Sequence, residues 1–74
     1  MTREDLVRLR QRAGNLETRE LRDAAAQCGW EYVRTRGGHH AYRKRGHRTL
    51  IIPDRVRSGT ARGIINALID SLEG

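Results

Sequence analysis

A pair of adjacent glycines, Gly37-Gly38, constrains the fold of this chain more than any other feature of its sequence. Residues 30–36, which precede the pair, are rich in aromatic and β-branched residues, as strands are. Glycine adopts positive φ without steric cost, so the pair suits the two-residue turn of a β-hairpin. The rest of the expected antiparallel sheet is a return strand over residues 39–44, a turn at Arg45-Gly46 and a third strand over residues 48–52 closed by Pro53.

Two helices are expected before this sheet. The first spans residues 2–12, with Thr2 as its N-cap and Asp5 in the capping-box position, and Gly14-Asn15 ends it. The second begins near Thr18 and has one apolar face at helical spacing. Its stripe consists of Leu21, Ala24, Ala25 and Cys28, and Gly29 is its expected C-terminal cap.

A third helix is expected after the sheet, with Ser58 or Thr60 as its N-cap. Its apolar stripe is the clearest helical signal in the chain and consists of Ile64, Ile65, Leu68, Ile69 and Leu72. These elements predict an α+β fold in which an α-β-β-β-α unit carries its helices on one face of a three-stranded antiparallel sheet. An extra N-terminal helix precedes that unit.

The length of 74 residues allows one domain with a thin core. We expect residues 1–74 to form this single domain, with residues 1–15 as an N-terminal helical extension and residues 16–74 as its core. No apolar run is long enough to span a bilayer, and the N-terminus lacks a signal-peptide stretch. We therefore expect a cytoplasmic protein with no membrane partner. The single cysteine, Cys28, has no disulfide partner and is expected to be buried.

Positive charge is concentrated in residues 32–53. The chain has a net charge of +6, and outside this segment nine arginines balance nine acidic residues. The segment contains no acidic residue, and its cations are Arg34, Arg36, Arg43, Lys44, Arg45 and Arg48. A local positive field attracts a polyanion, and arginine suits bidentate contact with phosphate. The alternative interpretation is a solvated face that keeps the protein soluble; a membrane-binding segment would instead be an amphipathic helix.

Two histidines, His39 and His40, follow the glycine pair directly. Neighbours on a strand point to opposite faces, so only one of them can face a given surface. Histidine can exchange a proton near neutral pH, and this suits a reaction in which an RNA 2′-hydroxyl attacks the adjacent phosphate. Arg36, Arg43 and Lys44 are expected to supply cations for the developing charge. The alternative is a structural or surface histidine. No carboxylate in the segment completes a ligand set, so we expect no metal site.

A second anion-binding candidate is the start of the last helix. Ser58-Gly59-Thr60 would present free backbone N–H groups there, flanked by Arg55, Arg57 and Arg62. Ordinary helix capping is the alternative. Trp30 and Tyr42 could stack on bases, but aromatic residues are scarce in this chain and Trp30 is expected in the core, so we do not predict stacking.

The order of these features resembles the HicA toxin family. The likeness runs from about Glu20 to about Ile69 and rests on the Gly37-Gly38-His39-His40 turn and on Gly59-Thr60 at the start of an isoleucine-rich helix. The resemblance implies a double-stranded-RNA-binding-domain-like fold. It also implies a toxin of a type II toxin–antitoxin system, an endoribonuclease that cleaves mRNA without a metal or another cofactor and is restrained by a HicB-like antitoxin.

The resemblance also implies roles for particular residues. His39 would be the general acid or base, His40 a second catalytic candidate, and Gly37 and Gly38 the residues that shape the turn. The residues expected to bind RNA are Arg34, Arg36, Arg43, Lys44, Arg45, Arg48, Arg57, Gly59, Thr60 and Arg62. The competing hypothesis is a non-catalytic RNA-binding module that uses the basic face of residues 32–53, and DNA binding ranks third.

Overall fold

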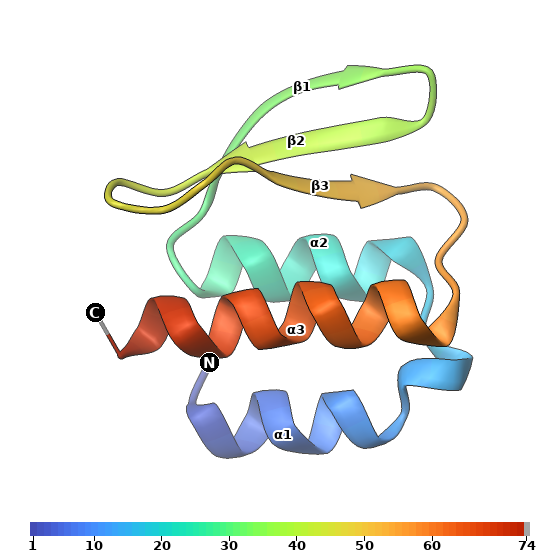
Figure 1. The fold of residues 1–74 in the computed structure, drawn as a ribbon, viewed down its shortest axis with the longest axis vertical. Coiled ribbons are helices and arrows are strands. Elements are labelled where there is room, and N and C mark those ends of the chain that lie inside the picture. Colours follow the sequence, from blue (N-terminus) through green and yellow to red (C-terminus); the bar gives the residue numbers. More distant parts are fainter. Residues whose placement is uncertain (74) are drawn as a thin grey trace.

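The chain folds into three layers, a sheet, a pair of helices beneath it and one more helix beneath that pair (Figure 1). The computed structural model describes residues 1–73. In chain order the elements are α1 (Arg3–Gln11), a 3-10 turn (Ala13–Asn15), α2 (Thr18–Gln27), β1 (Glu31–Arg36), β2 (His39–Arg43), β3 (Leu50–Pro53) and α3 (Ser58–Leu72). This confirms the predicted α+β class and the α-β-β-β-α order.

The sheet has the order β1-β2-β3 and is antiparallel throughout. Gly37 and Gly38 have φ values of 54° and 77°, as the two central residues of a type I′ hairpin turn require. The turn pairs Arg36 with His39. A bulge at Val33 then shifts the register between β1 and β2, which bends the edge strand β1.

One face of the sheet packs on α2 and α3, and the other face is open (Figure 1). The fully buried Ile52 marks the inner face, and its partner on β2 is His40. Because side chains alternate along a strand, the outer face carries the intervening residues. These outer residues are Glu31, Arg34 and Arg36 from β1, His39, Ala41 and Arg43 from β2, and Ile51 and Pro53 from β3.

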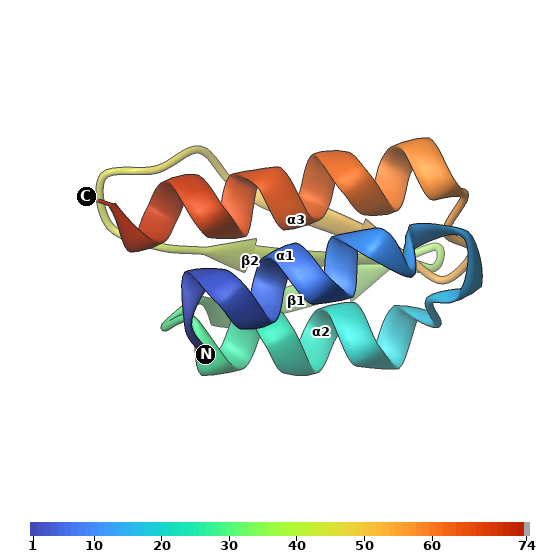
Figure 2. The same cartoon turned by 90° about the horizontal axis from the view of Figure 1, so that it is seen from below.

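Helix α1 lies across the side of α2 and α3 that faces away from the sheet (Figure 2). It begins as predicted, with a capping box in which the Asp5 N–H donates to Thr2 Oγ1 and the Thr2 N–H donates to Asp5 Oδ2. The backbone bond and then the side-chain bond to Thr2 lower the pKa of Asp5. Leu6 is fully buried in the core, so α1 contributes to the same core as the rest of the chain.

The cap predicted for the last helix is wrong. Arg57, with extended backbone angles, is the N-cap of α3, and no side chain caps it. The helix starts one residue earlier than a Ser58 cap requires, so Ser58 and Thr60 both lie within its first turn. The third strand also differs, because it begins at Leu50 and includes Pro53, which an edge strand tolerates.

Both predicted core residues near the end of α2 are buried. Cys28 is 5% exposed, and desolvation by burial raises the pKa of its thiol. Trp30 is also 5% exposed, and its indole N–H donates to Ser71 Oγ over 3.1 Å.

Within residues 1–73, no helix combines the length and the apolar character needed to cross a membrane.

We expect the substitution Leu6→Ala to lower the free energy of unfolding by about 2–5 kcal/mol, because it leaves a cavity between α1 and the helices it covers. Urea denaturation measures this, with the exposed Arg8→Ala on the same helix as a control that changes stability by no more than about 0.5 kcal/mol. Equal stabilities of the two variants would show that α1 is a detachable extension.

Candidate active site on the basic sheet face

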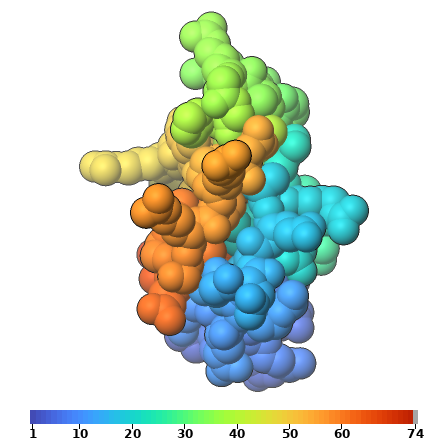
Figure 3. Space-filling view, turned by 90° about the vertical axis from the view of Figure 1, so that its right-hand side faces the viewer, coloured from blue at the N-terminus to red at the C-terminus, as the bar shows by residue number. Residues whose placement is uncertain are grey.

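The hairpin turn sends its two histidines to opposite faces of β2, as predicted. His39 is exposed on the outer face beside Arg36. His40 is 7% exposed on the inner face beside Thr35. Figure 3 looks onto this end of the molecule, where the turn, in green, projects above the orange segment that joins β3 to α3. The two histidines therefore have different surroundings, although they are neighbours in sequence.

The ring of His39 is held through one nitrogen only. Its Nδ1 lies 3.1 Å from the carbonyl oxygen of Gly37. A carbonyl only accepts, so this bond places a proton on Nδ1 and leaves the Nε2 lone pair of the neutral ring free to take a proton. The ring borders a shallow hollow of about 350 Å³ that is lined by Gly37, Gly38, His39, Pro53, Asp54 and Arg55. A ligand can reach this ring from solvent.

Both ring nitrogens of His40 are engaged. Nε2 lies 2.5 Å from Asp54 Oδ1, and Nδ1 lies 2.7 Å from Thr35 Oγ1. A carboxylate accepts, so Nε2–H donates to Asp54 and Nδ1 accepts from the Thr35 hydroxyl. The Thr35 hydroxyl is in turn 2.6 Å from the hydroxyl of Tyr32. With both nitrogens satisfied and the side chain buried, His40 fits a structural role better than proton exchange with a substrate.

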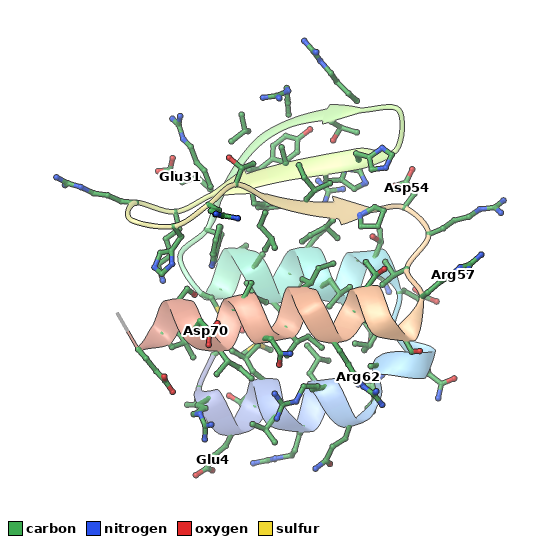
Figure 4. All side chains as sticks on the ribbon, in the orientation of Figure 1. Glu4, Glu31, Asp54, Arg57, Arg62 and Asp70 are labelled. Carbon is green, nitrogen blue, oxygen red and sulfur yellow. The ribbon has the colours of Figure 1, made fainter. Side chains whose placement is uncertain are left out.

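The structure separates the three cations that were expected beside His39. Arg36 is its direct partner across the hairpin, whereas Arg43 lies at the other end of β2, roughly 13 Å along the strand. Arg43 instead lies 3.9 Å from Glu31, at the end of the sheet opposite Asp54 (Figure 4). The prediction that Arg43 and Lys44 supply charge next to His39 is therefore wrong.

Lys44 has a structural position between the ends of two helices. Its Nζ donates to the carbonyl oxygen of Cys28 over 2.7 Å and to that of Ser71 over 3.3 Å. These carbonyls lie at the C-terminal ends of α2 and α3, where a cation is favoured by the helix dipole and by unpaired acceptors. The ammonium group is thus turned toward the protein interior.

The other expected RNA-binding cations fall into separate groups. Arg34 and Arg36 are exposed on the outer face of β1, and Arg45 and Arg48 are exposed in the loop between β2 and β3. At the start of α3, Arg57, Gly59 and Thr60 are exposed on the Asp54 side of the molecule, whereas Arg62 lies near α1 and lines a hollow with Val7, Arg10, Gln11 and Asn66 (Figure 4). Arg34 and Arg36 therefore share the outer face with His39 near the hairpin turn, whereas Arg43 lies at the far end of the same face.

Sequence reasoning missed two residues of this region. Asp54 is the first residue after the acid-free segment, and only the fold shows that its side chain contacts His40.

The second missed residue is Tyr32, which is 52% exposed, whereas Trp30 and Tyr42 are buried. The Tyr32 ring lies 5.3 Å from the Arg22 guanidinium carbon and 5.6 Å, centroid to centroid, from the Tyr42 ring. A hydrogen bond to Tyr42 raises the pKa of Arg22.

We searched residues 1–73 for side chains that could bind a metal ion. Among residues 1–73, no group of three or more His, Cys, Asp or Glu side chains is arranged to hold an ion. The acid that approaches the histidines, Asp54, is already bonded to His40. This surface presents the exposed ring of His39 beside Arg36, its partner across the hairpin.

The fold and the site define a small α+β domain that presents a solvent-accessible histidine beside a glycine turn on an open, basic sheet face. The family model for the HicA toxin of bacterial toxin-antitoxin matches residues 18–69, so the chain belongs to the HicA toxin family. The family consists of toxins from toxin–antitoxin systems, which in general are ribonucleases that cleave mRNA. Comparisons with curated proteins and with solved structures find no match. Helix α1 lies before the matched region.

We expect Lys44→Met to lower the free energy of unfolding by about 1–3 kcal/mol, because two carbonyls at the helix ends lose a charged donor while the aliphatic stem is kept. The matched control is Arg45→Met, an exposed neighbour with the same change of charge. Urea denaturation of both variants measures the difference. If Lys44→Met is as stable as Arg45→Met, the ammonium group is not a structural tie.

Proposed function

We propose that this protein is the toxin of a type II toxin–antitoxin system and an endoribonuclease that cleaves mRNA without a metal, with His39 as general base. One observation supports this most directly. His39 is exposed, its Nδ1 is bonded to Gly37, and its Nε2 is free on the face that carries Arg36 and Arg34. Family membership supplies the class of activity.

The proposed reaction uses the 2′-hydroxyl of the RNA as the nucleophile. Nε2 of His39 takes the proton of that hydroxyl as its oxygen attacks the adjacent phosphorus. The bond from phosphorus to the 5′-oxygen breaks, and that oxygen leaves and takes a proton from solvent water. The products are a 2′,3′-cyclic phosphate and a 5′-hydroxyl end. Arg36, opposite His39 in the hairpin, stabilises the negative charge that develops on the phosphate oxygens.

The substrate strand would lie on the outer face of the sheet. Arg34 and Arg36 stand two residues apart on the same face of β1, and both guanidinium groups suit phosphate oxygens. Ile51, 44% exposed on the neighbouring part of this face, offers an apolar surface for a sugar or base. Arg45 and Arg48 extend the positive surface beyond the sheet.

A HicB-like antitoxin is the proposed protein partner. The same outer face is open and carries a positive charge, so an acidic surface that covers Arg34, Arg36 and His39 would block RNA. RNA and antitoxin would then compete for one face.

The competing function is an RNA-binding module without catalysis. It uses the same arginines, and both functions predict binding that weakens with salt. One observation favours it. Arg43 and Lys44 lie away from His39, so Arg36 is the one cation paired directly with this histidine. The length of the RNA after incubation separates the two functions.

We expect purified wild-type protein to shorten end-labelled RNA in the presence of EDTA and to leave 5′-hydroxyl ends. His39→Ala should slow the cleavage at least about 100-fold through loss of the general base. His47→Ala, at the other end of the sheet beside Trp30, is the matched control and should cleave like the wild type. RNA with a 2′-deoxy sugar at the cleaved position should stay intact.

Two results would contradict this proposal. RNA that is bound but never shortened by the wild-type protein would establish the binding module. Equal cleavage by the wild type and His39→Ala would remove His39 from the catalytic role.

A further inference from the structure

The segment that follows β3 is fastened to the hairpin turn at a single residue, Asp54. Its backbone N–H donates to the Gly38 carbonyl over 2.7 Å, and its Oδ1 accepts from His40 Nε2 over 2.5 Å. The contact is close, because a Cβ added to Gly38 would stand 2.9 Å from Asp54 Oδ2. The backbone of Asp54 thus binds the turn, and its side chain binds His40 on β2, the strand that follows the turn.

His40, and Pro53 beside Asp54, make further hydrogen bonds to other elements of the fold. His40 is 7% exposed and is held from the other side by Thr35 on β1. The residue before Asp54, Pro53, accepts a hydrogen bond at its carbonyl from the Thr18 hydroxyl at the start of α2. The side chain of Asp54 is 61% exposed, yet its carboxylate is bonded to a histidine whose side chain is 9% exposed.

The turn transmits this restraint to His39. Two neighbouring carbonyls of the turn have different partners. The Gly37 carbonyl accepts from His39 Nδ1, and the Gly38 carbonyl accepts from the Asp54 N–H. The Gly37 and Gly38 carbonyls belong to the peptides on either side of the Gly38 Cα atom. A change in the backbone angles at Gly38 would reorient these peptides and disturb the two bonds, and a glycine at positive φ offers little resistance of its own to such a change. A bond from outside the turn, such as the one from Asp54, would therefore help to keep the His39 ring in one orientation.

We propose that His40 and Asp54 form a latch that holds the Gly37-Gly38 turn and thereby orients the ring of His39. His40 and Asp54 are positioning residues in this arrangement, since His40 has no free ring nitrogen to offer a substrate. The effect of the latch on cleavage rests on the proposed function. Its effect on the orientation of His39 does not.

The test compares Asp54→Ala, which removes the acceptor, with Asp54→Asn, which keeps an oxygen that can accept from His40. Asp70→Ala is the control, because Asp70 is an exposed acid on α3 far from the turn and its loss changes the net charge equally (Figure 4). Thr35→Val perturbs the same latch independently, since it removes the hydrogen bond between Thr35 and His40 Nδ1. Thermal unfolding establishes that each variant is folded.

The first measurement needs no RNA. The ¹⁵N chemical shifts of the His39 ring report its tautomer, and hydrogen exchange reports the bond from residue 54 to Gly38. We expect Asp54→Ala to shift the ring toward a mixture of tautomers and to speed exchange at residue 54 on the order of tenfold. Thr35→Val should act in the same direction, whereas Asp54→Asn and Asp70→Ala should resemble the wild type.

The second measurement is cleavage of the labelled RNA. Asp54→Ala should lower kcat on the order of tenfold with little change in KM, because a displaced base affects the chemical step more than binding. Asp54→Asn should recover most of the rate. A lost fold would also lower the apparent kcat, but it would lower the unfolding temperature as well, so thermal unfolding separates it from a displaced ring.

The outcomes separate the latch from the proposed function. An unchanged His39 ring and unchanged exchange in both Asp54→Ala and Thr35→Val would overturn the latch. A displaced ring with unchanged kcat would overturn its positioning role. If the wild type cleaves no RNA but Asp54→Ala still displaces the ring, the proposed function fails and the latch is supported.

Discussion

The type I′ turn at Gly37-Gly38 decides which histidine reaches the open face of the sheet. Because both residues have positive φ, the turn closes over two residues and pairs Arg36 directly with His39. A slip of one residue in this pairing would exchange the inner and outer faces of the strand. His40 would then lose Thr35 and Asp54, and His39 would be buried. The chemistry proposed for this protein thus depends on a backbone conformation that glycine adopts readily.

The sheet separates stability from recognition. Its inner face packs on α2 and α3 and carries the hydrogen-bond chain that runs from Tyr32 through Thr35 and the buried His40 to Asp54. Its outer face carries arginines that no helix covers (Figure 1). The core lies between the sheet and the helices and continues to Leu6 on α1, so the third layer supports the sheet without touching the outer face. A ligand that covers the outer face would therefore leave the core undisturbed.

Local patterns predicted most of the fold. The capping box at Thr2 and the hairpin at the glycine pair each depend on a few adjacent residues, and the structure confirms both. At the end of α2, the C-cap is Cys28, and Gly29 follows it with a φ of 85°. The failed predictions depend on tertiary contacts or on one-residue boundaries. Ser58 lies just inside α3 instead of capping it, and Lys44 turns inward because the ends of α2 and α3 meet beside it.

The site was predictable only in part. Alternation along β2 correctly placed the two histidines on opposite faces. It could not say which one is exposed, because that depends on the register set by the turn together with the packing of Ile52 on the core. Asp54 lies 14 residues from His40 in sequence, and their contact arises only when β3 returns beside β2. The role of His39 and the RNA-binding role of the arginines stay predictions.

The most direct test of the account is to map 5′-hydroxyl RNA ends in bacterial cells that express either the wild-type chain or His39→Ala at equal levels. The account predicts growth arrest and new 5′-hydroxyl ends in mRNA with the wild type, and neither with His39→Ala. Equal growth arrest and equal new ends from both proteins, or intact mRNA with the wild type, would contradict it.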